Sequence, residues 1–277
     1  MKYFHLIILL LFLHIVIAVS ALETGLDHGW TSRGLGMGGA FSSVANTAEA
    51  VYWNPAGLSR LSRQSLDSTF AKSFNEVNET AVFYAFPAGE SWALGAGFTR
   101  AEVGDIAGYD QSGNSTGTFA YREQVLYASA ANQWNAHWAW GGTLKFLSRQ
   151  ALATQSGLLW DAGLLYTLDH QRIAFVLENG FGSTMGIDSI APSYRLGISS
   201  DTAVGILSAD LRYKNSGFLF YGGVEYPLTS QLAVRAGISN GKFNVGLGLN
   251  WAMVSVDYVY AGSDLDAAHR FSLGCLL

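Results

Sequence analysis

The chain has little charge, almost no cysteine and, beyond residue 21, no long apolar run. Charged residues make up 13% of its 277 residues, although hydrophobic residues make up 49%. The single cysteine, Cys275, excludes an internal disulfide framework. A soluble domain with so few charges would be poorly covered by polar side chains. The wall of a transmembrane barrel, in contrast, needs apolar residues only at every second position and no long apolar run.

The one long apolar stretch lies at the N-terminus. Lys2 precedes a run from Leu6 to Val19 that is apolar apart from His14, and the small residues Ser20 and Ala21 follow. This pattern is typical of a secretory signal peptide, and the run is shorter than the ~20 residues of a spanning helix. The sequence therefore predicts a signal peptide at residues 1–21. A membrane anchor that stays attached is the less favoured alternative.

Acidic residues outnumber basic ones in the rest of the chain. Loss of Lys2 leaves 15 of the 16 basic residues against 21 acidic ones, a formal net charge of −6. Binding of nucleic acid needs a concentrated basic face, so nucleic acid is excluded as a partner.

From Ser65 to the C-terminus, bulky apolar residues alternate with small or polar ones. Phe243, Val245 and Leu247, for example, oppose Asn244 and Gly246. Side chains on a strand point alternately to its two faces, so such a strand has one lipid-compatible face and one small or polar face. A soluble β-sandwich also alternates, but its outer face would be charged, whereas the bulky face here is almost uncharged. The alternation predicts strands at 65–73, 78–87, 91–101, 122–131, 136–148, 155–167, 171–179, 192–200, 204–213, 217–226, 230–239, 243–251, 252–260 and 267–276.

The connections between these strands alternate broadly between short and long. Bacterial barrels join their strands by tight periplasmic turns and longer outer loops. The expected outer loops include 102–121, 180–191 and 261–266, and the connections on the other side are brief. We expect an all-β fold: a transmembrane antiparallel β-barrel of about 14 strands at 65–277, in the bacterial outer membrane, with both termini periplasmic. The short connections are expected at 88–90, 132–135, 169–170, 201–203 and 228–229.

The inward parity of the strands carries charges of both signs in nearly equal number. Such charges, facing one another across a narrow lumen, would pair and fill it, which argues against a wide ion-selective channel. Lys145 and Asp161 on neighbouring strands are the preferred pair. The side chains expected to face inward are Lys145, Asp161, Arg172, Glu178, Arg195, Asp210, Arg212, Glu225, Arg235, Asp257 and Arg270.

Residues 22–64, between the signal peptide and the first strand, are rich in glycine. A phosphate-binding loop is a weak interpretation, because the chain lacks the βαβ unit that such a loop requires. Close packing is the better one, since glycines let a backbone pass tightly against a wall, and Pro55 disfavours helix for Asn54. We expect this segment to sit in the barrel as a hatch, or plug. Its candidate residues are Arg33, Gly34, Gly36, Gly38, Gly39, Asn54, Pro55, Ala56 and Gly57.

Two motifs of this segment, RGLGMGGA at 33–40 and YWNPAGL at 52–58, resemble the N-terminal region of the PorV/PorQ family, within the wider FadL-like outer-membrane proteins. The resemblance continues in order along nearly the whole mature chain. Further matching segments are KFL at 145–147, WDAGLLY at 160–166, ENG at 178–180, RLG at 195–197, ADL at 209–211, GVEY at 223–226, LAVRAG at 232–237 and VDYVY at 256–260.

The resemblance implies a fourteen-stranded barrel with an N-terminal hatch that carries the Asn-Pro-Ala element. FadL-like members pass hydrophobic small molecules through the outer membrane, whereas PorV-like members serve secretion by binding exported cargo or secretion components. The sequence therefore leaves two hypotheses: transport across or secretion at the outer membrane through a plugged barrel, and a scaffold that binds envelope partners through its outer loops.

Catalysis and metal binding are not expected. His137 and His269 lie near predicted strand ends without a serine and acid partner at a spacing that would assemble a nucleophile. The scattered histidines and lone cysteine offer no metal-ligand spacing, and no cofactor is expected. Tryptophans such as Trp92, Trp138 and Trp251 are typical of a membrane-interface girdle. The chain ends in Cys-Leu-Leu, where barrels often finish on an aromatic residue.

Overall fold

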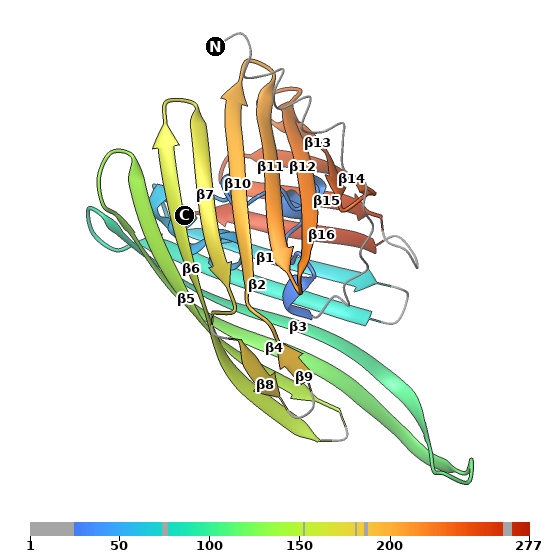
Figure 1. Cartoon of the computed structure of the whole chain (residues 1–277). Helices are drawn as coiled ribbons and strands as arrows, with labels where there is room; N and C mark the ends of the chain where they lie inside the picture. Colours follow the sequence, from blue (N-terminus) through green and yellow to red (C-terminus); the bar gives the residue numbers. More distant parts are fainter. Residues whose placement is uncertain (1–24, 74–76, 152, 181, 186–187, 263–267) are drawn as a thin grey trace.

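The structure is a computed structural model that describes residues 25–73, 77–151, 153–180, 182–185, 188–262 and 268–277 (Figure 1). The signal peptide predicted at 1–21 lies outside the described residues. Among the described residues, fourteen antiparallel strands form one closed barrel, in which β16 pairs with β1. The prediction of a fourteen-stranded barrel is therefore confirmed.

The barrel strands follow one another around the wall in chain order. They are β1 Ser65–Ser73, β2 Val77–Pro87, β3 Trp92–Tyr109, β4 Ser115–Gln133, β5 Trp138–Gln150, β6 Thr154–Leu168, β7 Gln171–Glu178, β10 Ser193–Thr202, β11 Gly205–Lys214, β12 Gly217–Pro227, β13 Leu232–Ser239, β14 Lys242–Trp251, β15 Val254–Ala261 and β16 Ala268–Leu276.

The two faces of the wall follow the alternation of the sequence. On β14, Phe243, Val245 and Leu247 are exposed on the outside of the barrel, while Asn244 and Gly246 between them are buried inside. The outer face is a belt of large apolar side chains. The inner face carries charged, polar and small residues, together with buried apolar side chains such as Phe83, Tyr127 and Leu159. Closing the sheet leaves no unpaired edge in the barrel wall, which suits a hydrocarbon surrounding.

The two ends of the barrel differ. One end, here the short-turn end, carries the brief connections 88–91, 134–137, 169–170, 203–204, 228–231 and 252–253, together with the start of β1 and the end of β16. The opposite end, the hairpin end, carries the other connections. Two of these are also tight: Asn215 and Ser216 have φ of 49° and 62°, and Asn240 and Gly241 have φ of 45° and 88°. Two-residue hairpins need positive φ, which Asn and Gly adopt most readily.

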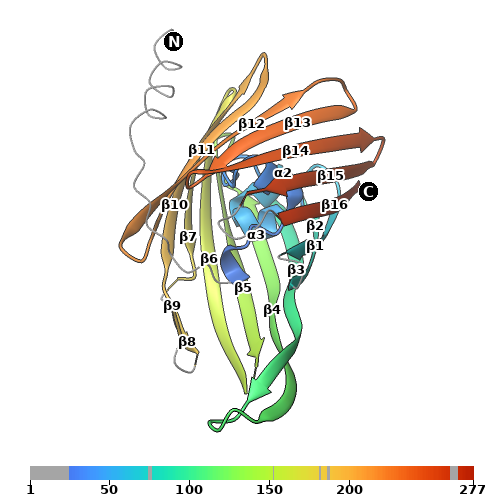
Figure 2. The same cartoon turned by 90° about the vertical axis from the view of Figure 1, so that its right-hand side faces the viewer.

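The segment 102–121 differs from expectation. The sequence predicts a loop here, but the segment forms the distal parts of β3 and β4 and the turn between them. In this turn, at 110–114, the Asp110 carboxylate accepts hydrogen bonds from Ser112 N and Asn114 N at 2.8 Å. Figures 1 and 2 show this ribbon, called here the β3–β4 arm (residues 103–121), projecting beyond its neighbours. Its Gly-, Ser- and Thr-rich sequence lacks apolar alternation because neither face meets a core or lipid. The loop expected at 180–191 likewise contains a small hairpin, β8 Ser183–Met185 and β9 Asp188–Ile190.

Residues 25–64, called here the N-terminal segment, lie inside the ring of strands (Figure 2). Their short elements are η1 Gly25–Asp27, α2 Ser32–Gly36, α3 Ala50–Trp53 and η2 Pro55–Arg60. Helix α2 contacts β13 to β16, whereas α3 and η2 contact β3 to β6. No helix in the part of the chain that the structure describes is long and apolar enough to cross a membrane.

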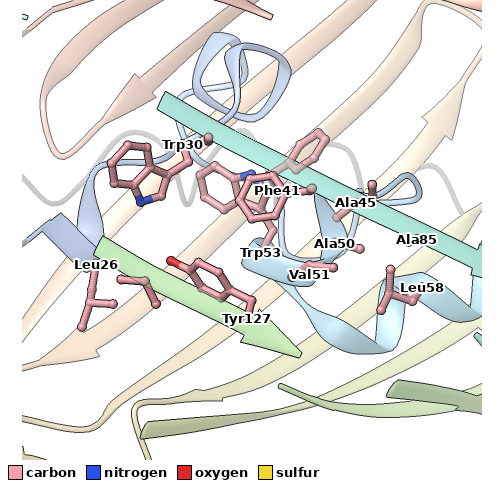
Figure 3. Close-up of a cluster of buried hydrophobic side chains, with 14 of the residues drawn as sticks. Leu26, Trp30, Phe41, Ala45, Ala50, Val51, Trp53, Leu58, Ala85 and Tyr127 are labelled. Carbon is pink, nitrogen blue, oxygen red and sulfur yellow. The ribbon is translucent and has the colours of Figure 1, made fainter. Parts of the chain in front are cut away.

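The main apolar core joins this segment to the wall (Figure 3). Phe41 and Trp53 of the segment pack edge to face with ring centroids 5.7 Å apart, and Val51 and Leu58 are fully buried. Tyr127 of β4 belongs to the same cluster. The core therefore sits within the lumen, so burial of the segment and stability of the barrel are linked.

Candidate functional site

Three glycines of the N-terminal segment, Gly36, Gly38 and Gly39, lie against the barrel wall. Gly38 has a φ of +66°, and a Cβ atom there would lie 2.5 Å from the backbone nitrogen of Ile238 and 2.6 Å from the carbonyl oxygen of Gly222. A Cβ on Gly36 would lie 3.3 Å from the Arg235 side chain. Gly39 lies beside Tyr221 of the wall, whereas Gly34 packs against the Trp53 ring and Gly57 against the carbonyl oxygen of Ala45.

Glycines of the wall face these positions. Gly223 and Gly237 lie directly against Met37 and Gly38, and Gly141 and Gly163 lie against Pro55 and Asn54. Sequence reasoning did not name these wall glycines as site residues. The available signal was a glycine at the inward parity of a strand, where a side chain would otherwise fill the lumen.

The Asn54-Pro55-Ala56-Gly57 element turns the segment between α3 and η2. Asn54 is fully buried, its side-chain oxygen accepts a hydrogen bond from Ala56 N at 3.0 Å, and its side-chain amide donates to Ser42 O at 2.8 Å. Pro55 begins η2, where its missing N–H is not needed. One asparagine thus caps a helix and ties two turns of the segment together.

A first charged cluster, the Glu225 network, holds α2 against the wall. Both oxygens of Glu225 accept hydrogen bonds at 2.9 Å from Arg33. Glu225 Oε2 also accepts one from Arg235 Nε at 2.5 Å, and Arg235 Nη1 contacts Asp257 Oδ1 at 2.5 Å. Charge-assisted, bidentate contacts of this kind are the strongest protein hydrogen bonds. Arg33 is therefore the charged link between the segment and β12.

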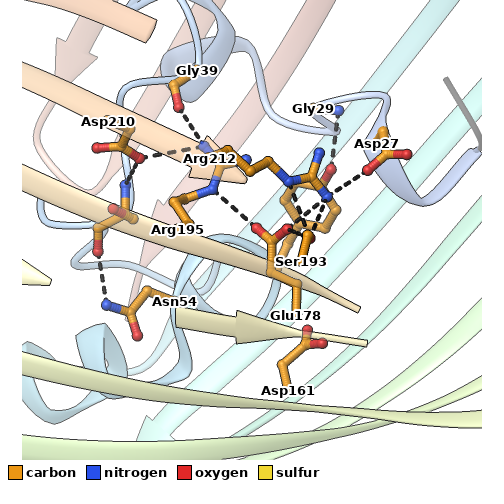
Figure 4. Close-up of polar contacts among 12 residues, drawn as sticks. Asp27, Gly29, Gly39, Asn54, Asp161, Glu178, Ser193, Arg195, Asp210 and Arg212 are labelled. Atoms are coloured by element: carbon orange, nitrogen blue, oxygen red, sulfur yellow. Dashed lines mark hydrogen bonds and ion pairs between the residues drawn. The ribbon is translucent and has the colours of Figure 1, made fainter. Parts of the chain in front are cut away.

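A second cluster, the Glu178 network, lies nearer the hairpin end (Figure 4). Glu178 pairs with Arg195 at 2.9 Å and with Arg212 at 2.6 Å, and Arg212 also pairs with Asp27 of the segment at 2.6 Å. Burial alone would raise the pKa of Asp27, but the neighbouring Arg212 and Lys214 cations hold it well below its usual range. Arg195 further contacts Asp210 at 3.3 Å.

The other inward charges that the sequence named are also paired. Lys145 Nζ lies 2.6 Å from Asp161 Oδ1, the pair that the sequence favoured, and donates to Asn179 Oδ1 at 2.5 Å. Arg172 pairs with Asp201, and Arg270 with Glu79. Sequence reasoning did not foresee Glu79 or Asp201, nor did it find the partners from the N-terminal segment.

Wall side chains also bind the backbone of the N-terminal segment directly. Arg195 donates to Gly39 O at 3.1 Å, Ser208 to Ala40 O at 2.7 Å, and Asn244 to Leu35 O at 2.8 Å. These contacts come from side chains and not from a strand ladder, so the segment is held without being part of the sheet.

Two cavities lined by described residues border the segment. A cavity of about 450 Å³ lies toward the short-turn end, between the segment and the wall from β11 to β16 and β1. A void of about 20 Å³ lies on the other side of the segment, bordered by Tyr52, Trp53 and the charged side chains of Lys145, Arg195 and Glu178. Neither of these two spaces is an apolar tunnel.

Comparison of the sequence with protein-family models and with curated proteins gives no match. Solved structures do match. The Pseudomonas putida toluene transporter TodX has a TM-score of 0.65 at 14% identity, over 93% of this chain and 98% of that chain. The CymD monoaromatic hydrocarbon channel has a TM-score of 0.66 at 14% identity, over 92% and 99%. A Pseudomonas aeruginosa FadL homologue has a TM-score of 0.63 at 11% identity, over 88% and 97%. At these identities the comparison shows that the chain shares the fold of such barrels.

Proposed function

We propose that this protein is an outer-membrane transport barrel whose lumen is plugged by the N-terminal segment, and that it passes a hydrophobic small molecule when the segment moves. The observation that carries the proposal is the way the segment is held. It fills the lumen, yet it is attached by side-chain contacts such as Arg33 with Glu225 and not by strand pairing. Barrels of the same fold are named as transporters of toluene and channels for monoaromatic hydrocarbons, which supports a hydrophobic cargo.

A pair of engineered disulfides tests whether the segment must move. Ser32 Oγ of the segment and Ser272 Oγ of β16 are 2.6 Å apart, so cysteines at both positions would tie the segment to the wall. The hydroxyl oxygens of Thr69 on β1 and Ser272 on β16 are also 2.6 Å apart, and cysteines at these two positions would join two wall strands only. Both variants are made in a Cys275→Ser background to remove the native thiol.

Uptake of radiolabelled toluene and oleate is measured in cells that lack other outer-membrane barrels for these compounds. Oxidation of Ser32→Cys/Ser272→Cys is expected to reduce uptake at least tenfold, with recovery on reduction. Oxidation of Thr69→Cys/Ser272→Cys is expected to leave uptake unchanged. Equal uptake by the oxidised and reduced forms of the first variant would contradict a moving plug, and absence of uptake by the unmodified protein would contradict transport.

A second candidate function is supported by the β3–β4 arm. The arm projects beyond the neighbouring strands, and within the described part of the chain its residues 103–109 and 115–121 pair only with each other, which leaves both edges of the ribbon without a strand partner there. A free strand edge is a common docking surface for an extended polypeptide. A role in secretion or as an envelope scaffold, of the kind that the PorV/PorQ resemblance implies, would use this arm.

A further inference from the structure

The cavity toward the short-turn end has an unusual distribution of charge. Its lining includes the side chains of Arg33 and Glu49 from the N-terminal segment and Asp67, Glu225 and Asp257 from the wall. Arg235 lines it as well. Four carboxylates therefore face two guanidinium groups in a space of about 450 Å³.

The two guanidinium groups are already committed. Arg33 makes a bidentate pair with Glu225, and Arg235 bridges Glu225 and Asp257. These two cations are thus matched by two carboxylates. Glu49 and Asp67 remain as the surplus. The Ser65 hydroxyl lies 3.2 Å from Asp67, and the Thr47 hydroxyl is a further hydrogen-bonding partner of Asp67. A surplus of negative charge away from bulk water favours entry of a cation.

Glu49 is the more deeply placed of the two. Its side chain is only 4% exposed, and the nearest cationic atom is Arg33 Nη1 at 3.6 Å. That same nitrogen donates a hydrogen bond to Asn46 at 2.8 Å. Burial, aided by the charge of Asp67, raises the pKa of Glu49 to about 7. The Glu49 carboxyl is therefore partly protonated near pH 7, and a bound cation would displace that proton.

The volume and lining of the cavity indicate what kind of cation it fits. Ligand pockets commonly measure about 300 to 1,000 Å³, far more than a bare ion needs. Apolar side chains of Ile206 and Ala233 line the same space beside the carboxylates. A ligand that satisfies both surfaces carries one compact charge on a small apolar body.

We propose that this cavity binds a small organic amine, with its ammonium group against Glu49 and Asp67 and its apolar body against Ile206 and Ala233. The site is independent of the transport proposal, because a ligand reaches it from the short-turn end without displacement of the N-terminal segment. Binding to the purified barrel therefore tests it without any measurement of uptake.

The experiment uses the exported protein purified in a nonionic detergent at pH 8, where Glu49 is mostly ionised. Benzylammonium, benzyl alcohol and benzoate are titrated calorimetrically, since these probes share a ring and differ in charge; micelles without protein give the partition blank. Benzylammonium is expected to bind saturably to one site, at least tenfold more tightly than benzyl alcohol, with no saturable binding of benzoate. Equal binding of the amine and the alcohol would overturn the proposal, and so would absence of saturable amine binding.

Matched variants locate the site. Glu49→Gln and Asp67→Asn are each expected to weaken benzylammonium binding at least tenfold, whereas Asp169→Asn, in a turn away from the cavity, is expected to leave it unchanged. Migration of the unheated protein on a denaturing gel checks that each variant is folded. Folded Glu49→Gln with unchanged amine affinity would reject the site. In a competition titration, calcium and a second amine are each added to displace benzylammonium. If calcium displaces it at the lower concentration, the site prefers a metal ion and the proposal is overturned.

Discussion

Glycine at position 38 combines two demands that other residues meet only at a cost. Its φ of +66° disfavours any side chain, and the wall at Ile238 and Gly222 leaves no room for a Cβ atom. Gly38→Ala is expected to lower the free energy of unfolding by about 2–4 kcal/mol, from backbone strain and overpacking together. Gly241→Ala is the control, since Gly241 has a φ of +88° but nothing within 4 Å of its Cβ position. Equal losses in the two variants, measured by urea unfolding, would show that contact with the wall is unimportant.

The buried pair of Lys145 and Asp161 makes a second prediction at this scale. Asp161→Asn leaves the Lys145 ammonium buried and short of a partner, so we expect a loss of about 3 kcal/mol in unfolding free energy. Lys145→Gln in addition is expected to restore part of that loss, with a coupling energy of about 1–3 kcal/mol. A double-mutant cycle of unfolding midpoints measures the coupling. Additive effects would show that the two side chains do not stabilise each other.

Glu49 links stability to pH. Its folded-state pKa of about 7 lies above the ordinary value of 4.5, so the native state holds this proton more tightly than the unfolded chain does. The resulting stabilisation is fully present below about pH 4.5 and is lost as the pH rises through about 7. We expect the free energy of unfolding to decrease from pH 5 to pH 8 in both proteins. The decrease should be about 1–3 kcal/mol larger in the wild type than in Glu49→Gln. Parallel pH profiles of the two proteins would contradict this assignment.

At the scale of elements, the fourteen strands could be predicted because the outer face of the wall carries bulky apolar side chains at every second position. Leu247 and Leu249 alternate with Gly246 and Gly248, and this period identifies β14 within a residue of its observed start. The β3–β4 arm could not be predicted, since neither of its faces is selected for apolar residues. The partners of Arg33 and Asp27 could not be predicted either. Pairing between residues 192 and 185 positions apart depends on how the segment enters the lumen, which no local pattern records.

The β3–β4 arm carries its own prediction. Removal of residues 106–117 with a short turn in their place should leave the barrel intact, because the wall pairing of β3 and β4 begins below the arm. The variant is expected to keep its unfolding midpoint and toluene uptake but to lose envelope partners captured by crosslinking from whole cells, if the arm is a docking surface. A matched deletion in the small β8–β9 hairpin controls for loss of any outer hairpin. Unchanged capture would remove the arm from the scaffold hypothesis.

At the scale of the whole molecule, the N-terminal segment fills the lumen of the barrel, and Arg33 is one of the charged links between them, alongside Asp27. Arg33→Gln removes the bidentate pair with Glu225. Glu225 then keeps the hydrogen bond from Arg235 but has lost its contact with the segment. The segment should then leave its seat more often. In planar bilayers we expect the wild type to stay closed and Arg33→Gln to open in bursts at least tenfold more frequently. The neutral double variant Lys145→Gln/Asp161→Asn removes an ion pair confined to the wall, so it should stay as quiet as the wild type. Bursts in both variants would mean that lumen charges stabilise the barrel generally, whereas bursts in Arg33→Gln alone would identify the N-terminal segment as the element that closes it.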